Sequence, residues 1–295
     1  LTLPRCEAWP IVQESEGSAS GRSPLLYKLP ARAEAARILS FAAVCTLLAA
    51  CAAGPTERRA AVEDPAHRPL VFERLEFSSD KIEPGQPVRI LNPWGNIELR
   101  KDDSVGAVHL TAAIQRIGDP PPAPPEFAKR FDGDTHVIEV EFPSARREAP
   151  RTGRVDLAVY VPPGHPLILE TTDGLIKAKK TLNPIRARST SGDIYLVTDG
   201  AIDARSVSGR VQVRPMYDPW HRADLVSETG PVVIFLPMPA DYSLLAEGTS
   251  DVHAEIPLTS TGTTHRAGVE GAANEVRMRT SGMIEIYESL LEEDL

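Results

Sequence analysis

The chain has 295 residues, enough for one large domain or two small ones, and only 5% of them are aromatic. Its 27 Pro and 20 Gly favour strands and turns over helices. The formal net charge of −9, without a basic cluster, argues against nucleic-acid binding and against electrostatic attachment to anionic lipid.

The first 50 residues divide into two parts. Residues 1–30 have neither helical nor strand periodicity and the chain contains no Met before Met216, so we expect an extension from a mis-assigned start of translation. Arg32 and Arg37 then form a short basic flank before the apolar run ILSFAAVCTLLAA at 38–50. This run of 13 residues is typical of a signal-peptide core and too short to span a bilayer, which needs about 20 residues.

The apolar run ends in LAAC at 48–51, which resembles the lipobox of bacterial lipoproteins. The resemblance implies cleavage before Cys51 and a diacylglycerol on its thiol, so that the lipid anchors the chain to a membrane outside the cytoplasm. Ala52 after the cysteine implies the outer membrane by the sorting rule of that family. An ordinary secretory signal with a chance cysteine is the alternative. Because Cys6 and Cys45 would leave with the signal, the mature chain could form no disulfide.

Strand signals follow a short tether. Residues 51–70 are small, polar and Pro-containing, and we expect them to be flexible. From Val71 onward, nine of the 20 glycines begin the pattern Gly-x-[IVL]-x-[AVIL], whose two aliphatic residues face one side of a strand. We expect each glycine to supply a turn with positive φ, and the hydroxyl residue directly before it to cap that turn. Those hydroxyl residues are Ser191, Ser208, Thr229 and Ser281.

The later copies of the pattern are longer and align through the glycine. They are IRARSTSGDIYLV (185–197), IDARSVSGRVQVR (202–214), ADLVSETGPVVIF (223–235), the degenerate LLAEGTSDVHAEI (244–256) and VRMRTSGMIEIYE (276–288). Equivalent aliphatic residues from Ile176 to Val252 are 18, 17, 21 and 20 residues apart.

This spacing, with one turn signal per unit, predicts an all-β, single-domain β-solenoid or β-helix over residues 71–288. We expect less regular strands at the start of this domain and an acidic tail at 289–295. An antiparallel β-sandwich is the alternative fold, because its short strands give a similar rhythm.

The sequence shows no catalytic or metal-binding arrangement. The outward positions after the turn glycines keep no common chemistry. Asp173, Asp193, Asp199 and Asp203 could approach one another on adjacent coils, but Asp beside Gly is more often a turn residue. The seven His residues lack the spacing of a metal site. We therefore expect no enzymatic activity, no cofactor and no metal.

The insertion YDPWHR at 217–222 is the candidate contact site. Exposed aromatic side chains with polar tips often anchor partners. Tyr217, Trp220 and His221, together with Trp94, are therefore candidate contacts for a ligand or partner. In the alternative interpretation, Tyr217 and Trp220 fold back against the edge of the solenoid.

The order NPWGNIEL, VDLAVYVPPGHPLILETTDGLIKAK, STSGDIYLV and SVSGRVQVR resembles the bacterial "putative adhesin" family, a β-helix domain of unknown function. The resemblance covers residues 71–287 and implies an extracytoplasmic β-solenoid, often lipid-anchored, without established catalytic residues. The 217–222 loop and the degenerate copy at 248–254 depart from the family's pattern. These turn-and-strand motifs specify a fold more than an activity.

We expect a lipid-anchored, non-enzymatic envelope protein that serves as a binding, adhesion or scaffold module. Its expected partners are the membrane, through the lipid, and an envelope protein or a polysaccharide, but no nucleic acid. Two alternatives remain open. A polysaccharide-active β-helix enzyme would need carboxylates within about 5 Å of each other. A periplasmic sensor or assembly factor would use the open end of the solenoid.

Overall fold

The computed structural model describes residues 70–101, 107–118, 120–143, 153–216 and 220–290. These residues form 21 strands in two mixed sheets, and none of them is helical. The prediction of an all-β fold is thus confirmed. Within the same residues there is no helix of the length and apolarity needed to cross a membrane. The predicted signal and Cys51 lie outside the described residues.

The two sheets have ten and eleven strands. In spatial order, the ten-stranded sheet consists of β1 (Leu70–Lys81), β4 (Ala107–Ile117), β7 (Gly153–Val161), β3 (Ile97–Lys101), β9 (Ile176–Thr181), β11 (Ile194–Thr198), β13 (Val211–Pro215), β15 (Val232–Met238), β21 (Ile284–Leu290) and β17 (Val252–Ala254). The eleven-stranded sheet consists of β18 (Thr259–Thr261), β19 (Thr264–Gly268), β16 (Tyr242–Glu247), β20 (Asn274–Arg279), β14 (Arg222–Ser227), β12 (Ile202–Ser206), β10 (Ile185–Ser189), β8 (Leu167–Thr171), β2 (Val88–Leu91), β6 (Thr135–Glu141) and β5 (Glu126–Asp132).

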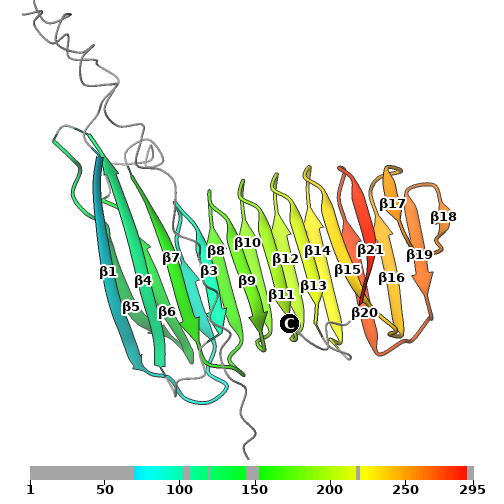
Figure 1. Cartoon of the computed structure of the whole chain (residues 1–295), viewed down its shortest axis with the longest axis horizontal. Coiled ribbons are helices and arrows are strands. Elements are labelled where there is room, and N and C mark those ends of the chain that lie inside the picture. Colours follow the sequence, from blue (N-terminus) through cyan, green and yellow to red (C-terminus); the bar gives the residue numbers. More distant parts are fainter. Residues whose placement is uncertain (1–69, 102–106, 119, 144–152, 217–219, 291–295) are drawn as a thin grey trace, which may run out of the picture. The chain divides into compact units, whose positions relative to one another are not determined.

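Successive strands from β8 to β15 alternate between the two sheets, as can be followed in Figure 1. Each of them pairs in parallel with the strand two places away in the chain, so that β10 lies between β8 and β12. The registers join residues that the sequence alignment equates: Ile185 pairs with Ile202, and Ile194 pairs with Val211. The alignment therefore predicted which residues lie side by side.

Antiparallel pairing occurs toward both ends of the sheets. Strands β1, β4 and β7 form an antiparallel group at one edge of the ten-stranded sheet (Figure 1). Strand β5 pairs antiparallel with β6 at one edge of the eleven-stranded sheet, and β16, β19 and β18 do so at its other edge. The less regular N-terminal strands expected from the sequence fall within β1 to β7.

The spatial order of the strands departs from the chain order near β20 and β21. Strand β20 lies between β14 and β16, and β21 lies between β15 and β17 (Figure 1). Segment 276–288 is therefore inserted between the two segments that precede it, instead of closing the series. Buried Asn274, the first residue of β20, bonds to the segments on both sides of this strand. Its Oδ1 accepts the main-chain N–H of Trp220 at 2.9 Å, and its Nδ2 donates to the carbonyl of Asp241 at 2.9 Å.

The core lies between the two sheets. In β11, Ile194 and Leu196 are buried, whereas Tyr195 and Val197 between and beside them are half-buried on the outward side. The same alternation fills the inward side of the other central strands with Ile, Leu, Val and Ala. Because burial of one large aliphatic side chain contributes about 1.5–3 kcal/mol, each strand depends on the opposite sheet for its stability.

Close stacking of the turns explains the glycines. A Cβ on Gly209 would lie 2.1 Å from the carbonyl oxygen of Gly192, and a Cβ on Gly192 would lie 1.7 Å from that of Gly174. Gly95 has the positive φ expected from the sequence, at 127°, but Gly192 and Gly209 do not. The expectation of a positive φ is therefore wrong for Gly192 and Gly209. Glycine is required there because the backbone of the preceding turn leaves no room for a side chain.

A column of buried hydroxyl groups joins consecutive turns. Ser206 Oγ accepts the N–H of Gly209 at 2.9 Å and donates to the carbonyl of Gly192 at 3.1 Å. Ser227 repeats the pattern with Gly230 at 3.0 Å and Gly209 at 2.8 Å. The hydroxyl residues directly before the glycines, which the sequence predicted as caps, also donate to the neighbouring turn, as Ser191 Oγ does to the carbonyl of Thr172 at 3.1 Å. The buried cap lies three residues before the glycine, because that residue holds the last inward position of its strand.

Candidate anion-binding face

The outward side of the eleven-stranded sheet carries an array of arginines on β10, β12, β14 and β20. Alternate residues of these strands are buried, so the residues between them face outward. We call this surface the arginine face. It consists of six arginines and three carboxylates: Arg186, Arg188, Asp203, Arg205, Arg222, Asp224, Glu275, Arg277 and Arg279. Its excess of cations contrasts with the formal net charge of −9 of the whole chain.

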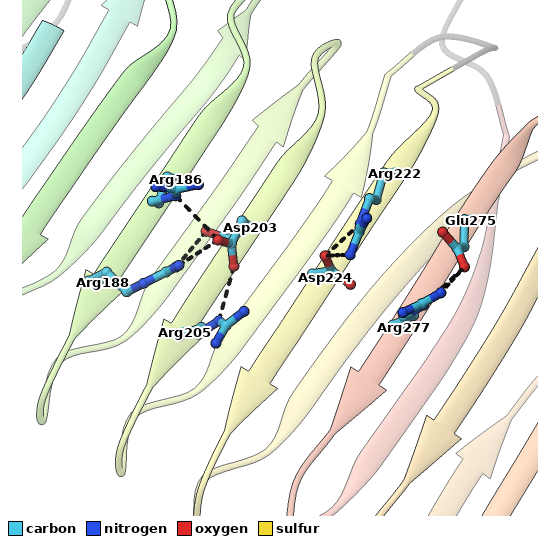
Figure 2. Close-up of polar contacts among 8 residues, drawn as sticks. All are labelled: Arg186, Arg188, Asp203, Arg205, Arg222, Asp224, Glu275 and Arg277. Carbon is cyan, nitrogen blue, oxygen red and sulfur yellow. Dashed lines mark hydrogen bonds and ion pairs between the residues drawn. The ribbon is translucent and has the colours of Figure 1, made fainter. Parts of the chain in front are cut away.

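Asp203 on β12 lies among three guanidinium groups of this face (Figure 2). Its carboxylate oxygens are 3.3 Å from Arg186 Nε and 3.1 Å from Arg205 Nε. Arg188 donates both to this carboxylate and to the main-chain carbonyl of Asp203. Burial alone would raise the pKa of Asp203, but the hydrogen bond and charge of Arg188 and the charge of Arg205 lower it. The ionised carboxylate of Asp203 therefore forms ion pairs with three guanidinium groups.

Two further ion pairs lie along single strands (Figure 2). Arg222 Nη2 lies 2.6 Å from Asp224 Oδ2 on β14, and Arg277 Nη2 lies 2.6 Å from Glu275 Oε1 on β20. The pairs form because residues two apart on a strand face the same side. The hydrogen bond from Arg222 to Asp224 raises the pKa of Arg222. Exposed ion pairs contribute about 0–1 kcal/mol, so these order the side chains more than they stabilise the fold.

A row of outward residues crosses the strands beside Asp203. Arg188, Arg205, Val226 and Arg279 are consecutive register partners on β10, β12, β14 and β20. Three of the four carry a guanidinium group. Within the described part of the chain, Arg279 makes no hydrogen bond or ion pair through its side chain. Its register partner on the neighbouring strand β16 is Glu247, which makes no direct ion pair with it in the described part of the chain.

Hollows of the surface adjoin this row. The first hollow has a volume of about 600 Å³ and is lined by Arg186, Arg205 and Arg222, among other residues. Arg188, Arg205 and Arg279 line another of about 570 Å³. A third, of about 270 Å³, is lined by Arg205, Arg222 and Arg279. Because Arg205 lines all three, the hollows adjoin around it and together form an extended site.

A two-point ion pair extends the charged surface onto β2 and β8. Arg89 Nη2 donates to Glu170 Oε1 at 3.0 Å and to Glu170 Oε2 at 2.9 Å. The hydrogen bond to Glu170 raises the pKa of Arg89. This pair shows that a guanidinium on this sheet can reach a carboxylate held on the neighbouring strand.

The chemistry of the arginine face suits anion binding better than acid–base catalysis. Guanidinium groups bind carboxylate, sulfate or phosphate oxygens through two N–H groups at once. A general acid needs a raised pKa, whereas the pKa of Asp203 is lowered. Among the residues that the structure describes, no group of three or more His, Cys, Asp or Glu is placed to hold a metal ion.

The four aspartates considered as a catalytic group lie in different places. Asp173 and Asp193 are in the turns after β8 and β10, where Asp193 Oδ1 accepts the N–H of Arg210 at 2.8 Å. Asp199 follows the far end of β11, and burial raises its pKa. Asp203 belongs to the arginine face. The fold therefore does not bring the four carboxylates together.

The candidate contact residues are also separated. Trp220 is fully buried in the core, so its ring is not exposed as a ligand contact would require, and its burial agrees with the folded-back alternative. His221 is exposed, has a φ of 63° and directly precedes Arg222 of the arginine face. Trp94 is half-buried in the turn before β3, bridged to the turn after β8. Tyr217 lies outside the described residues.

The sequence analysis did not predict the arginine face, although the sequence contains a pattern that indicates it. The outward positions after most of the turn glycines belong to the ten-stranded sheet and show no common chemistry, whereas Gly200 precedes β12 and Asp203 of the other sheet. The arginines lie before the glycine, at alternate positions of IRARS (185–189), IDARS (202–206) and NEVRMR (274–279). This alternation could have indicated a charged row on the other sheet.

No family model matches the chain. No curated protein matches it. Similar solved structures include a putative cell adhesion protein from Clostridium sporogenes, 13% identical, with 74% of this chain and 100% of that chain covered and a TM-score of 0.42. They also include a putative adhesin from Bacteroides fragilis, which is 9% identical. The match covers 76% of this chain and 98% of that chain, with a TM-score of 0.24. Both scores are below 0.5, so function is inferred below from the residues of this chain.

Proposed function

We propose that this chain is a non-enzymatic binding module of the bacterial envelope and that its arginine face contacts an anionic partner. The observation that carries the proposal is the presence of six arginines against three carboxylates on the outward side of β10, β12, β14 and β20, with Glu170 and Glu247 on the strands that flank these four. A local excess of one charge attracts ligands of the opposite charge and speeds their association. Among the candidate contacts that the structure describes, the exposed His221 borders the face, since it directly precedes Arg222.

The proposal includes a β-solenoid over residues 71–288, of the kind that the "putative adhesin" resemblance implies. Its support is the alternation of successive strands between two sheets with parallel pairing. Such a path repeats the same outward positions on consecutive strands and so gathers side chains into rows. A rigid surface of this kind suits adhesion or scaffolding, because neither role needs a moving part.

The proposed location is outside the cytoplasm, at the outer membrane, with a lipid on Cys51 and a tether at 51–70. The apolar run at 38–50 and the LAAC end support this location. A lipid would hold the chain without a polybasic patch. The arginine face would then be available to a partner in the envelope.

The two other functions have less support. A polysaccharide-active enzyme needs paired carboxylates, and Asp193 and Asp199 lie beyond opposite ends of β11. A sensor or assembly factor would use the edge strands of the sheets, where the charges of β1 and β5 form ion pairs of opposite sign, such as Arg74 with Glu76 and Arg130 with Glu139. A binding role is therefore the function best supported by the geometry.

Retention of the full chain on heparin-agarose, a polyanionic matrix, tests the proposed function. We expect a variant with Arg188→Gln, Arg205→Gln and Arg279→Gln to elute at much lower salt than the unsubstituted chain, because three phosphate- or sulfate-type contacts are lost. The matched control loses the same charge elsewhere, on β1, β3 and β9: Arg74→Gln, Arg100→Gln and Lys177→Gln.

The control should elute like the unsubstituted chain. Equal elution of both triple variants would show that the arginine face is not the contact surface. The non-enzymatic part is tested on the same samples, because heparin recovered after long incubation should keep its original chain length.

A further inference from the structure

We propose that the partner of the arginine face is an acidic polysaccharide, a linear polymer with spaced carboxylates and free hydroxyls, lying across β10, β12, β14 and β20. This inference rests on the proposed function and deepens it by naming the class of ligand. It follows from the mixture of charges on the face, from their spacing and from the kind of residues that line the hollows.

The face alternates cations with carboxylates and is not uniformly positive. Along one row, Arg186, Asp203, Asp224 and Arg277 are consecutive register partners. Guanidinium groups donate hydrogen bonds only, and ionised carboxylates accept them only. A complementary ligand must therefore bring acceptors to the arginines and donors to the aspartates. A polymer with both carboxylates and hydroxyls supplies both.

A densely charged polymer fits this mixture less well. Double-stranded DNA carries one negative charge per about 1.7 Å of its axis, so some of its phosphates would face the carboxylates of the arginine face. Asp203 stays ionised because of its arginine partners, and it would repel such a phosphate. A polymer with one carboxylate on each sugar has uncharged stretches that can pass over Asp203 and Asp224.

The spacing of the arginines favours a long ligand over a small anion. Neighbouring strands of a sheet lie about 4.7–4.9 Å apart, so the row from Arg188 through Arg205 to Arg279 extends over about 14–15 Å. One small anion would reach one or two of these guanidinium groups. A linear polymer would reach all three, and each added contact would form at a high effective concentration.

The hollows beside the row are suited to sugar rings more than to nucleobases. The hollow of about 600 Å³ combines arginines with apolar residues, namely Pro87, Pro166, Leu167, Pro184 and Ile185. Binding of single-stranded nucleic acid usually relies on bases stacked on aromatic side chains. The described residues that line the hollows around Arg205 include no Phe, Tyr or Trp.

The experiment measures binding of polygalacturonate fragments of increasing length to the full chain by isothermal titration calorimetry at one fixed ionic strength. We expect affinity to rise with length until a fragment covers the arginine face and then to level off. Methyl esterification, which removes the charge and keeps the sugar backbone, should abolish binding. Each arginine-to-glutamine change at 188, 205 or 279 should weaken binding by about tenfold, because a charged hydrogen bond contributes about 1.5 kcal/mol or more.

Dextran sulfate and double-stranded DNA are the comparison polymers. If either binds the chain more tightly than polygalacturonate of similar length, the face is a general cation surface, and this inference is wrong while the proposed function stands. If the chain binds neither polygalacturonate nor heparin, both are wrong. The variant Asp203→Asn with Asp224→Asn should shift the preference toward dextran sulfate, because it removes the repulsion.

A conservative variant keeps the test valid if a glutamine variant folds poorly. Arg205→Lys retains the charge and loses the planar two-point donor. We expect it to keep most of its retention on heparin but to bind polygalacturonate more weakly than the unsubstituted chain. Equal binding of polygalacturonate by both would contradict two-point recognition of carboxylates at Arg205.

Discussion

Arg188 on β10 holds Asp203 on the neighbouring strand β12 by two contacts. Its guanidinium donates to the side-chain carboxylate and, at 3.0 Å, to the main-chain carbonyl of the same residue. The pair therefore joins two strands in addition to their parallel ladder. It also fixes the position of a carboxylate that Arg186 and Arg205 contact, so the order of these two side chains depends on it.

Replacement of Asp203 by asparagine should lower the free energy of unfolding by about 1 kcal/mol at neutral pH. The amide keeps the size of the side chain and removes the charge that Arg186, Arg188 and Arg205 share. Denaturant titration measures the loss. Asp134→Asn, an exposed change in the turn after β5, is the matched control and should have almost no effect.

The destabilisation by Asp203→Asn should depend on pH in a defined direction. The pKa of Asp203 in the folded chain is below its ordinary value of 3.8, so near that pH the unfolded chain binds more protons. The stabilisation is complete above the ordinary pKa and is lost as the pH falls through the folded-state pKa. Melting temperatures should therefore differ by a constant amount near neutral pH and converge below about pH 4. A difference in melting temperature that stays constant in acid would contradict a lowered pKa of Asp203.

Gly209→Ala should destabilise the fold by about 1–3 kcal/mol or more, since the added methyl group would meet a backbone atom that cannot move alone. Its Cβ would lie 2.1 Å from the carbonyl oxygen of Gly192 in the preceding turn. Ser208→Ala, one residue earlier and exposed, is the control and should be nearly neutral. Thermal unfolding of the two variants checks this. Equal stability would show that the turns have room to separate.

The buried hydroxyl column makes a related but distinct prediction. Ser206→Ala leaves the N–H of Gly209 and the carbonyl of Gly192 without their side-chain partner in a buried turn. Loss of such a partner costs about 1–3 kcal/mol. Hydrogen exchange should show faster opening of the Gly209 amide in this variant, whereas Ser208→Ala should leave it unchanged. An unchanged amide in Ser206→Ala would mean that the hydroxyl does not hold the turn.

The strands and their registers could be predicted because they follow from local pattern. Each turn glycine fixes the end of one strand, and the aliphatic alternation fixes its inward side, so Ile185 and Ile202 had to be partners. The position of segment 276–288 could not be predicted in this way. Val276 fits beside Ala223 as well as beside Leu244, and it lies between both.

The arginine face and the burial of Trp220 depend on contacts that the local pattern does not encode. An outward position tolerates many residues, so a single arginine in IRARS carries no meaning until its neighbours in space are known. Asp203 contacts Arg188, which is 15 residues away in the chain, and this neighbour is not visible in the local pattern of β12. The sequence left open whether Trp220 is an exposed contact or folds back, and in the structure Asn274 of β20 accepts its main-chain N–H and the core covers its ring.

Asn274→Ala should be among the most destabilising changes outside the apolar core. It removes the acceptor for the N–H groups of Trp220 and His221 and the donor to the Asp241 carbonyl. Because the main-chain N–H of Trp220 is buried and the other two groups are part-buried, we expect a loss of about 1–3 kcal/mol. Glu270→Gln, an exposed change in the turn before β20, is the control. If Asn274→Ala and the unsubstituted chain had nearly equal unfolding midpoints, β20 would be held only by its main-chain hydrogen bonds to β14 and β16.

Cys51→Ala tests the anchoring on which the envelope location rests. If the thiol carries a lipid, the unsubstituted chain should fractionate with membranes, incorporate labelled fatty acid and have an intact mass that corresponds to a start at Cys51 plus the lipid. The variant should lose the label and the membrane association, because the lipid is the proposed anchor. Its arginine face should be unaffected, so its retention on heparin is the internal control. Membrane association that persists in the variant would contradict the lipid anchor without touching the binding site.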